Sequence, residues 1–289
     1  MKLARLNAVR CLVGESPVWD EAEQALFLVD IAGSKLHRLD PQADTAVSWD
    51  TPGMVTAMAL GKPGEILIAM ADTIHAFNLE TGATRPVAVA EAQPANATIN
   101  DGRVDRQGRF VVGSCCTDFA APSPVGGIYA LENERCRKLA GDITFSNGAC
   151  FSPDGSTLYF ADSAHNAVFA YTYDTATGDV GERRLLTDTL ALGGLPDGAT
   201  VDASGNLWVT INQGGKVAAF HPDGTLSRIV ELPTSRPGSV AFGGPNLDRL
   251  FVTTIDLAYF GEGQDGQGGY VFAIDGLGTR GLPEPRYRG

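Results

Sequence analysis

The chain has 289 residues and a formal net charge of −12, and its 35 glycines and 16 prolines are spread over the whole length. Its lysines and arginines form no basic block, which excludes the usual phosphate-binding surface, so we expect neither nucleic acid nor an anionic membrane as a partner. With no apolar N-terminal segment and no run of about 18 apolar residues, the sequence predicts a soluble, cytoplasmic protein.

The elements expected along the chain are short β-strands, because Gly and Pro recur and no amphipathic helix of three turns is found. Residues 3–10 form a lone strand. A unit of three strands and turns then repeats, with starts at residues 15, 56, 100, 147, 197 and 238. This spacing is typical of propeller blades. We therefore predict an all-β, six-bladed β-propeller that forms a single domain over residues 1–289, closed by the N-terminal strand in the last blade.

Four polar side chains stand at the same point of the repeat, next to Gly or Pro turns, in units one, three, four and five. They are Glu15, Asn100, Asn147 and Asp197. Because the first strands of propeller blades line one channel, we expect these groups to meet there. Two carboxylates in a channel repel each other unless a cation neutralises them. Oxygen ligands favour Ca²⁺, Mg²⁺ or Mn²⁺, and they can also hold Zn²⁺.

Several stretches carry a resemblance to a known family: Gly14-Glu15-Ser16-Pro17-Val18-Trp19, Asn100-Asp101-Gly102-Arg103-Val104-Asp105, Ser146-Asn147-Gly148, Phe151-Ser152-Pro153-Asp154-Gly155, Pro196-Asp197-Gly198 and Phe242-Gly243-Gly244. In motif, order and spacing the chain resembles the regucalcin/gluconolactonase family of six-bladed propellers, which includes senescence-marker-protein and luciferin-regenerating-enzyme-like members. The resemblance implies a lactonase of the carboxylic-ester hydrolase class that hydrolyses a sugar-acid lactone with one divalent cation, Ca²⁺ first.

The resemblance also implies roles for individual residues. Glu15, Asn147 and Asp197 match the metal ligands, and Asn100 matches a residue that faces the substrate and a water molecule. The cation would polarise the lactone carbonyl, and Asp197 would double as the candidate general base. Whether Asp197 takes the proton from water or the cation lowers the pKa of that water stays open.

One departure from the family pattern concerns the substrate. Many members carry an arginine that grips sugar hydroxyls where this chain has Thr98, and a sugar-binding acid of some relatives corresponds to Asp118. We expect Thr98, Asn100 and Asp118 to orient the sugar hydroxyls. A lactone with a negative charge would need a cation at the rim, for which Arg103 and Arg236 are candidates. The insert at residues 118–126 is a candidate lid.

Two other functions compete with the lactonase. One is hydrolysis of phosphotriesters or fluorophosphates on the same scaffold, and the other is a non-enzymatic propeller that binds calcium or a protein partner. A serine-hydrolase elbow is not supported, since no G-x-S-x-G occurs. The five cysteines are odd in number and show neither a C-x-x-C pair nor a zinc pattern, so we expect buried free thiols.

Overall fold

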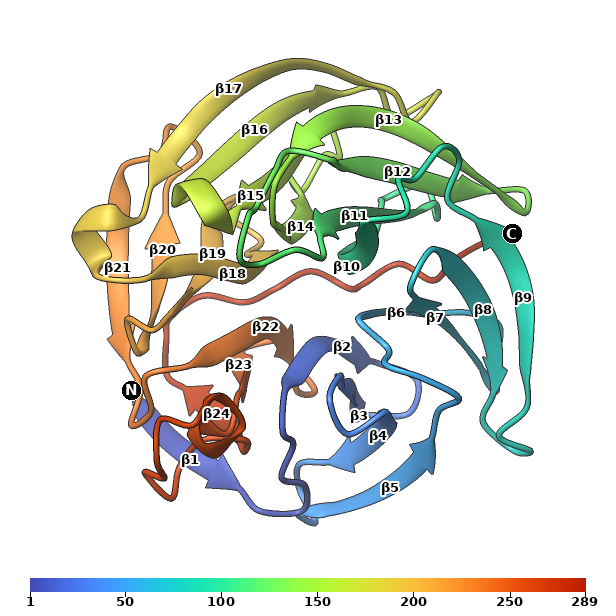
Figure 1. Ribbon diagram of the computed structural model, residues 1–289. Helices are drawn as coiled ribbons and strands as arrows, with labels where there is room; N and C mark the ends of the chain where they lie inside the picture. The colour runs from blue at the N-terminus through green and yellow to red at the C-terminus, as the bar shows by residue number, and fades with distance from the viewer.

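The computed structural model describes residues 1–289 and contains six four-stranded antiparallel sheets arranged in a ring (Figure 1). This arrangement confirms the six-bladed β-propeller predicted from the repeat. The helical elements are three short 3₁₀ turns, η1 (Ser163–His165), η2 (Leu190–Leu192) and η3 (Leu257–Phe260). No helix has the length and apolar character needed to cross a membrane.

The strands follow one another through the blades in chain order, with one exception in the last blade. Blade one holds β2 (Gly14–Asp20), β3 (Ala25–Asp30), β4 (Lys35–Asp40) and β5 (Thr45–Asp50); blade two holds β6 (Ala57–Leu60), β7 (Glu65–Met70), β8 (Thr73–Asn78) and β9 (Thr84–Val89); blade three holds β10 (Ala97–Val104), β11 (Phe110–Cys116), β12 (Gly126–Glu132) and β13 (Arg135–Ile143). Blade four holds β14 (Ser146–Phe151), β15 (Thr157–Asp162), β16 (Ala167–Tyr173) and β17 (Val180–Asp188); blade five holds β18 (Leu195–Val201), β19 (Leu207–Asn212), β20 (Lys216–Phe220) and β21 (Leu226–Glu231); blade six holds β22 (Pro237–Gly243), β23 (Arg249–Thr254), β24 (Val271–Asp275) and β1 (Lys2–Leu6).

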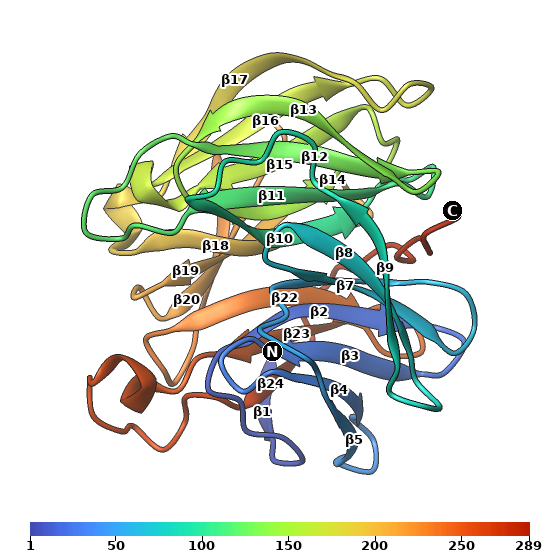
Figure 2. The same ribbon diagram turned by 45° about the vertical axis from the view of Figure 1, so that its right-hand side comes forward.

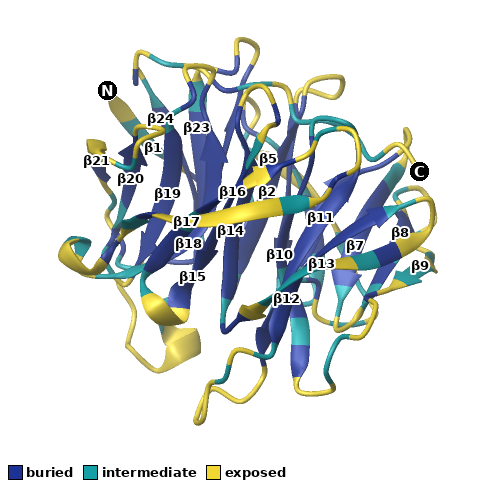
Figure 3. Cartoon of the chain, turned by 90° about the horizontal axis from the view of Figure 1, so that it is seen from above, coloured by how far each residue is buried: buried dark blue, intermediate teal, exposed yellow.

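The first strands of the six blades line the centre of the ring. Each of them packs against the first strand of the next blade, from β2 through β6, β10, β14, β18 and β22 back to β2. Figure 2 shows the blades fanning outward from this centre. The outermost strands are mostly exposed, as in β5 and β17, and the inner strands are buried (Figure 3). The ring therefore has a solvent-exposed outer edge, and its inner strands surround a central channel.

The core consists of six apolar clusters, one between each pair of neighbouring blades. Strand β3 shows how the sequence produces them. Phe27 and Val29 pack toward blade two, whereas Leu26 and Leu28 pack toward blade six. Because successive strand residues point to opposite faces, a strand that is buried on both faces reads as a continuous apolar run.

The N-terminal strand closes the ring, as the sequence predicts. β1 pairs antiparallel with β24, from Lys2 opposite Asp275 to Leu6 opposite Val271. It is shorter than the strand expected over residues 3–10. It ends at Leu6 because the next two backbone N–H groups donate to the carboxylate of Asp44 in blade one.

The C-terminal residues 276–289 form no strand and run across the base of the ring (Figure 1). Glu284 faces Arg103 at 3.8 Å, and Arg286 pairs with Asp20. Backbone hydrogen bonds join the same segment to blades five, six, two and three, at Ala203, Leu247, Leu60 and Gly108. These contacts lie at the carboxyl ends of the inner strands, opposite the strand starts that carry the candidate site residues.

Ring closure generates a stability prediction. Leu6→Ala removes a buried side chain of β1 and is expected to lower the free energy of unfolding by about 2–3 kcal/mol, because a cavity would open between blades six and one. Leu226→Ala, on the exposed edge strand β21, is the matched control and should change stability by less than about 0.5 kcal/mol. Urea unfolding measures both; equal effects would contradict the role of β1.

Candidate functional site

The inner strands share a β-bulge at one point of the repeat. The strand register shifts between Glu15 and Val18 in β2, and equivalent shifts occur in β10, β14, β18 and β22. Strand β6 has no such shift. A bulge re-aims the side chains around it, and here it stands next to each candidate residue. Left-handed backbone accompanies two of the bulges, at Ser16 (φ 48°) and Gly148 (φ 61°).

The four polar residues singled out in the sequence lie in one cavity. A cavity of about 370 Å³ opens at the start of the inner strands, and its wall includes Glu15, Asn100, Asn147 and Asp197. These residues come from blades one, three, four and five, so the ring brings together groups that are far apart in the chain. Their chemical roles stay predictions.

The two asparagines form a hydrogen-bonded row along one side of the cavity. The Asn100 amide donates to the Asn147 Oδ1 atom at 3.0 Å and to the Ser146 carbonyl at 2.8 Å. The Asn147 amide donates to the Ser163 hydroxyl at 2.9 Å, which donates to the Pro196 carbonyl at 2.5 Å. The Asn100 oxygen accepts no hydrogen bond from the protein, and the Asn147 oxygen keeps a second lone pair beside the bond from Asn100, so both can accept a ligand.

Three carboxylates are buried together at this end of the channel: Glu15, Asp101 and Asp197. Burial raises the pKa of Glu15 well above its usual range, and the charges of Asp197 and Asp101 raise it further. Burial also raises the pKa of Asp197, from 3.8 to about 7, although the Asn212 amide and the Arg236 charge oppose this change. The cluster is therefore costly to ionise without a compensating cation.

A second row of polar groups supports Asp197 from blades five and six. The Asn212 amide donates to Asp197 Oδ2 at 2.7 Å, and Arg236 Nη1 donates to Asn212 Oδ1 at 3.1 Å. The Arg236 guanidinium also pairs with Glu262 and lies 4.3 Å from the centre of the Phe260 ring. Arg236 is the only basic side chain on the cavity wall.

Sequence reasoning did not single out Asp101, Ser163 or Asn212 as site residues. Asp101 follows Asn100 in the Asn-Asp-Gly motif, so the motif itself contained a signal. It accepts the Ala149 backbone N–H at 3.2 Å and joins blades three and four. Asn212 ends the second strand of blade five, and Ser163 follows the second strand of blade four as the first residue of η1. Neither residue carries a distinctive local pattern.

The structure does not bring Thr98, Asp118 or Arg103 to the cavity wall. The Thr98 hydroxyl donates to the backbone carbonyl of Ala71 at 3.3 Å, and the Asp118 carboxylate accepts backbone N–H groups of its own turn. Arg103 is buried deeper in the channel, where it donates to backbone carbonyls of two other blades. Burial in these contacts places Arg103 as a support of the channel wall. Arg236, the other candidate cation, does line the cavity.

The insert after Cys116 reaches the cavity mouth with Phe119 and Pro122, and not with Asp118. Phe119 and Pro122 belong to the wall, and Phe260 of η3 lies on it as well. Phe119 is 71% exposed and Phe260 is 50% exposed. These side chains give the mouth an apolar border above a polar floor.

The residues present fit a divalent cation. Glu15 and Asp197 bring negative charge, and the only hydrogen bond to the Glu15 carboxylate comes from the adjacent Ser16 N–H at 3.1 Å. Asn147 adds a neutral oxygen that its neighbours hold in place. An oxygen set of two carboxylates and an amide suits a hard cation such as Ca²⁺.

Comparison with known proteins gives the family. Residues 13–256 match the model of the "SMP-30/Gluconolactonase/LRE-like region". The chain belongs to the SMP-30/gluconolactonase/LRE-like family. The resemblance inferred from the motifs is thus confirmed. Within the family, regucalcin of Xenopus laevis is 34% identical over 96% of this chain and 95% of its own length.

Two further family members bear on the chemistry. The 6-deoxy-6-sulfogluconolactonase of Pseudomonas putida is 33% identical over 84% of this chain and 83% of its own length. The crystal structure of regucalcin from Agrobacterium tumefaciens, described as a calcium-binding protein, has a TM-score of 0.89 and 30% identity. The alignment covers 99% of this chain and 97% of that one. The family therefore includes both a lactonase and a calcium-binding protein.

Gly238 provides a structural test of the cavity floor. A Cβ atom at this position would lie 2.4 Å from Glu15 Oε1 and 2.6 Å from the Gly14 carbonyl oxygen. We therefore expect Gly238→Ala to displace the Glu15 carboxylate and, because Glu15 is a predicted metal ligand, to weaken binding of a divalent cation such as Ca²⁺ at least about tenfold. Gly53→Ala is the control, since its Cβ would meet only Met70 sulfur at 3.9 Å. Titration calorimetry with Ca²⁺ measures the difference; unchanged affinity in Gly238→Ala would contradict it.

The carboxylate cluster predicts a pH dependence of stability in chelator. Because the native pKa of Asp197 is raised to about 7 from 3.8, native protein holds a proton that the unfolded chain has released between these values. Raising the pH through this window should lower the free energy of unfolding, by on the order of 2–4 kcal/mol relative to Asp197→Asn. Urea unfolding across the window measures this difference. A stability difference that does not vary with pH would refute the expectation. Added Ca²⁺ should reduce the pH dependence of this difference.

Proposed function

We propose that the protein hydrolyses the ester bond of a sugar-acid lactone, with a divalent cation held by Glu15, Asn147 and Asp197. The observation that carries the proposal is the burial of Glu15 and Asp197 in one cavity beside the paired amides of Asn100 and Asn147. Membership of a family that includes a lactonase supports it. A bound cation would supply Lewis-acid polarisation of the carbonyl oxygen.

The side chains of the cavity account for the other needs of the reaction. Hydrolysis adds water to the carbonyl carbon, breaks the ring C–O bond and leaves a carboxylic acid and an alcohol. Asp197 is the candidate base that accepts a proton from the attacking water, since its carboxylate lies on the cavity wall. Asn212 fixes the Oδ2 atom of Asp197 and leaves its Oδ1 atom without a hydrogen bond from the protein. The amide oxygen of Asn100 can accept a hydrogen bond from a substrate hydroxyl.

The apolar mouth has a role in the same scheme. Phe119, Phe145 and Phe260 stand on the cavity wall and limit the access of bulk water. Exclusion of water strengthens the electrostatic interactions between the floor and the substrate. The cavity volume of about 370 Å³ lies in the range of small-molecule sites.

Turnover of lactones tests the proposal directly. We expect metal-dependent acid release from at least one aldonolactone, followed with a pH indicator after chelation and after addition of Ca²⁺, Zn²⁺, Mg²⁺ or Mn²⁺ singly. Asp197→Asn should lower kcat at saturating metal by about 100-fold or more, because it removes the base. Asp223→Asn, on an exposed turn, is the matched control. Folded protein that turns over a phosphotriester but no lactone would overturn the proposal.

We also propose that the charge of Arg236 determines whether an anionic or a neutral lactone is preferred. Three carboxylates line the cavity, so an anionic substituent finds a favourable partner only beside Arg236. The ratio of kcat/KM for a sulfonated lactone to that for its neutral counterpart should fall about tenfold or more in Arg236→Gln. Arg85→Gln, on the outer face of blade two, should leave the ratio unchanged. An unchanged ratio in Arg236→Gln would show that Arg236 does not distinguish anionic from neutral lactones.

A further inference from the structure

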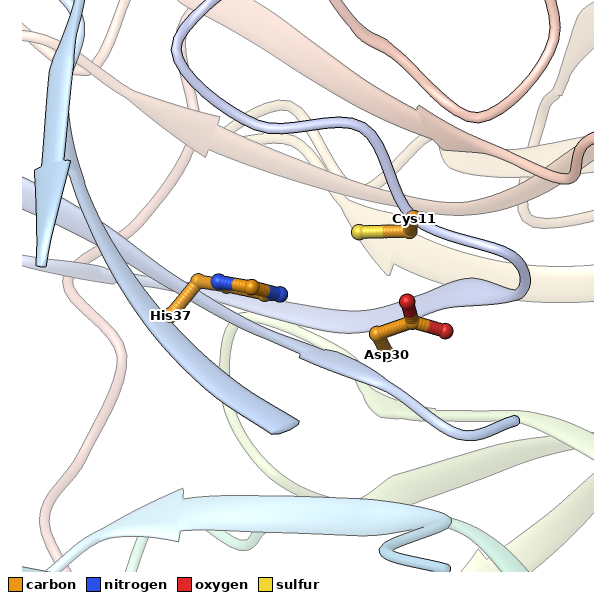
Figure 4. Close-up of side chains that lie close together, drawn as sticks. All are labelled: Cys11, Asp30 and His37. Atoms are coloured by element: carbon orange, nitrogen blue, oxygen red, sulfur yellow. The ribbon is translucent and has the colours of Figure 1, made fainter. Parts of the chain in front are cut away.

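A second group of metal-ligating side chains lies in blade one, outside the cavity. Cys11, Asp30 and His37 point toward one another, as Figure 4 shows, and their ligand atoms all lie within 4.8 Å of one another. The three residues are 1%, 4% and 5% exposed. They come from the segment between β1 and β2, from the end of β3 and from the middle of β4. None of them lines the proposed lactone site.

His37 presents an unpartnered nitrogen to this group. Its Nδ1 atom lies 2.7 Å from the Ser48 hydroxyl, whereas its Nε2 atom is buried and has no hydrogen-bond partner. When Nδ1–H donates to Ser48, the lone pair of Nε2 is free. Metal-binding histidines typically have this arrangement, with one nitrogen held by a neighbour and the other on the ion.

Asp30 and Cys11 add the other two donor atoms. The carboxylate of Asp30 accepts the backbone N–H groups of Leu12, Val13 and Gly33 at 2.9–3.0 Å, which fixes its orientation. The Cys11 sulfur is buried beside this carboxylate, and a thiol gives up its proton when it binds a metal ion.

Blade four contains an internal comparison for this arrangement. Asp162 accepts the backbone N–H groups of Thr144 and Phe145 in the way that Asp30 accepts those of Leu12 and Val13. A histidine, His165, also lies 3.0 Å from Asp162, but its side chain is 63% exposed and no cysteine accompanies it. The carboxylate is thus a recurrent structural anchor, while the buried sulfur and unpartnered imidazole occur in blade one.

We propose that Cys11, Asp30 and His37 bind a zinc-class transition metal ion. A sulfur, an imidazole nitrogen and a carboxylate oxygen form a ligand set that suits Zn²⁺ and disfavours Ca²⁺. The fourth tetrahedral position is left to water, because Oδ1 of Asp30 already accepts two backbone N–H groups. Because the ligands are sealed from solvent, the ion enters as the chain folds.

The position of this site connects it to ring closure. Cys11 lies between β1, in blade six, and β2, in blade one, and its N–H donates to the Gly269 carbonyl at 2.8 Å. A metal bond to Cys11 would tie this linking segment to β3 and β4. The ion would therefore hold together the two blades at which the propeller is closed, and its role is structural.

Cobalt provides a direct test, because a cobalt–thiolate bond gives a near-ultraviolet charge-transfer band. Protein stripped with chelator would be titrated with Co²⁺, both as the folded chain and during refolding from urea. We expect one equivalent per chain to produce the band, Zn²⁺ to abolish it and excess Ca²⁺ to leave it unchanged. Zinc should also raise the Tm of the stripped protein.

Variants separate this site from the lactone cavity. Cys11→Ser should lose the band, and His37→Gln should bind Co²⁺ at least about tenfold more weakly. Cys116→Ser and Glu15→Gln should keep it, since Cys116 is the thiol on the cavity wall and Glu15 is a proposed ligand there. Circular dichroism would confirm that each variant is folded. Absence of the band from both preparations of the native chain, or its persistence in Cys11→Ser, would overturn the proposal and leave a thiol–imidazole contact only.

Discussion

Burial of both faces of every blade is the constraint on which this structure depends. Each sheet contributes one face to the cluster on its left and the other to the cluster on its right, so the six clusters form a closed series. An open ring would leave two apolar faces and an unpaired strand edge in water. Pairing of β1 with β24 supplies the missing strand, and closure therefore stabilises interfaces far from the N-terminus.

The same ring also makes room for groups that are costly to bury. Apolar packing between the blades is extensive enough to offset three carboxylates at the mouth of the channel and left-handed backbone at Ser16. The bulges concentrate this cost at one end of the inner strands. The predicted binding residues and the apolar core thus occupy separate regions of blades one, three, four and five: the predicted binding residues lie at the strand starts, and the apolar core lies between the sheets.

The sequence predicted the features that depend on periodicity. Blade number, ring closure and the meeting of Glu15, Asn100, Asn147 and Asp197 all follow from equivalent positions in a repeat. Positions outside the repeat could not be inferred in this way. The direction of Asp118 depends on the turn of its own insert. Arg103 lies two residues beyond the bulge of β10, so the local backbone turns its side chain into the channel wall.

The other residues that could not be identified from the sequence depend on contacts between elements. Asn212 is distinctive only because Arg236, from the next blade, orients its amide. Cys11, Asp30 and His37, the proposed zinc ligands, have no recognisable metal-site spacing, since the chain brings them together from a linker and two strands. Pattern reasoning finds sites that are repeated or contiguous. Sites assembled once, across a linker, require coordinates.

The C-terminal segment across the base of the ring limits where a ligand can enter and leave the channel. Its bonds to five of the six blades close the end opposite the cavity. A ligand that reaches the floor at Glu15 and Asp197 must leave past the same aromatic border of Phe119 and Phe260 by which it entered. Ligands therefore enter and leave through the same opening of the cavity. One ligand must leave before the next can bind.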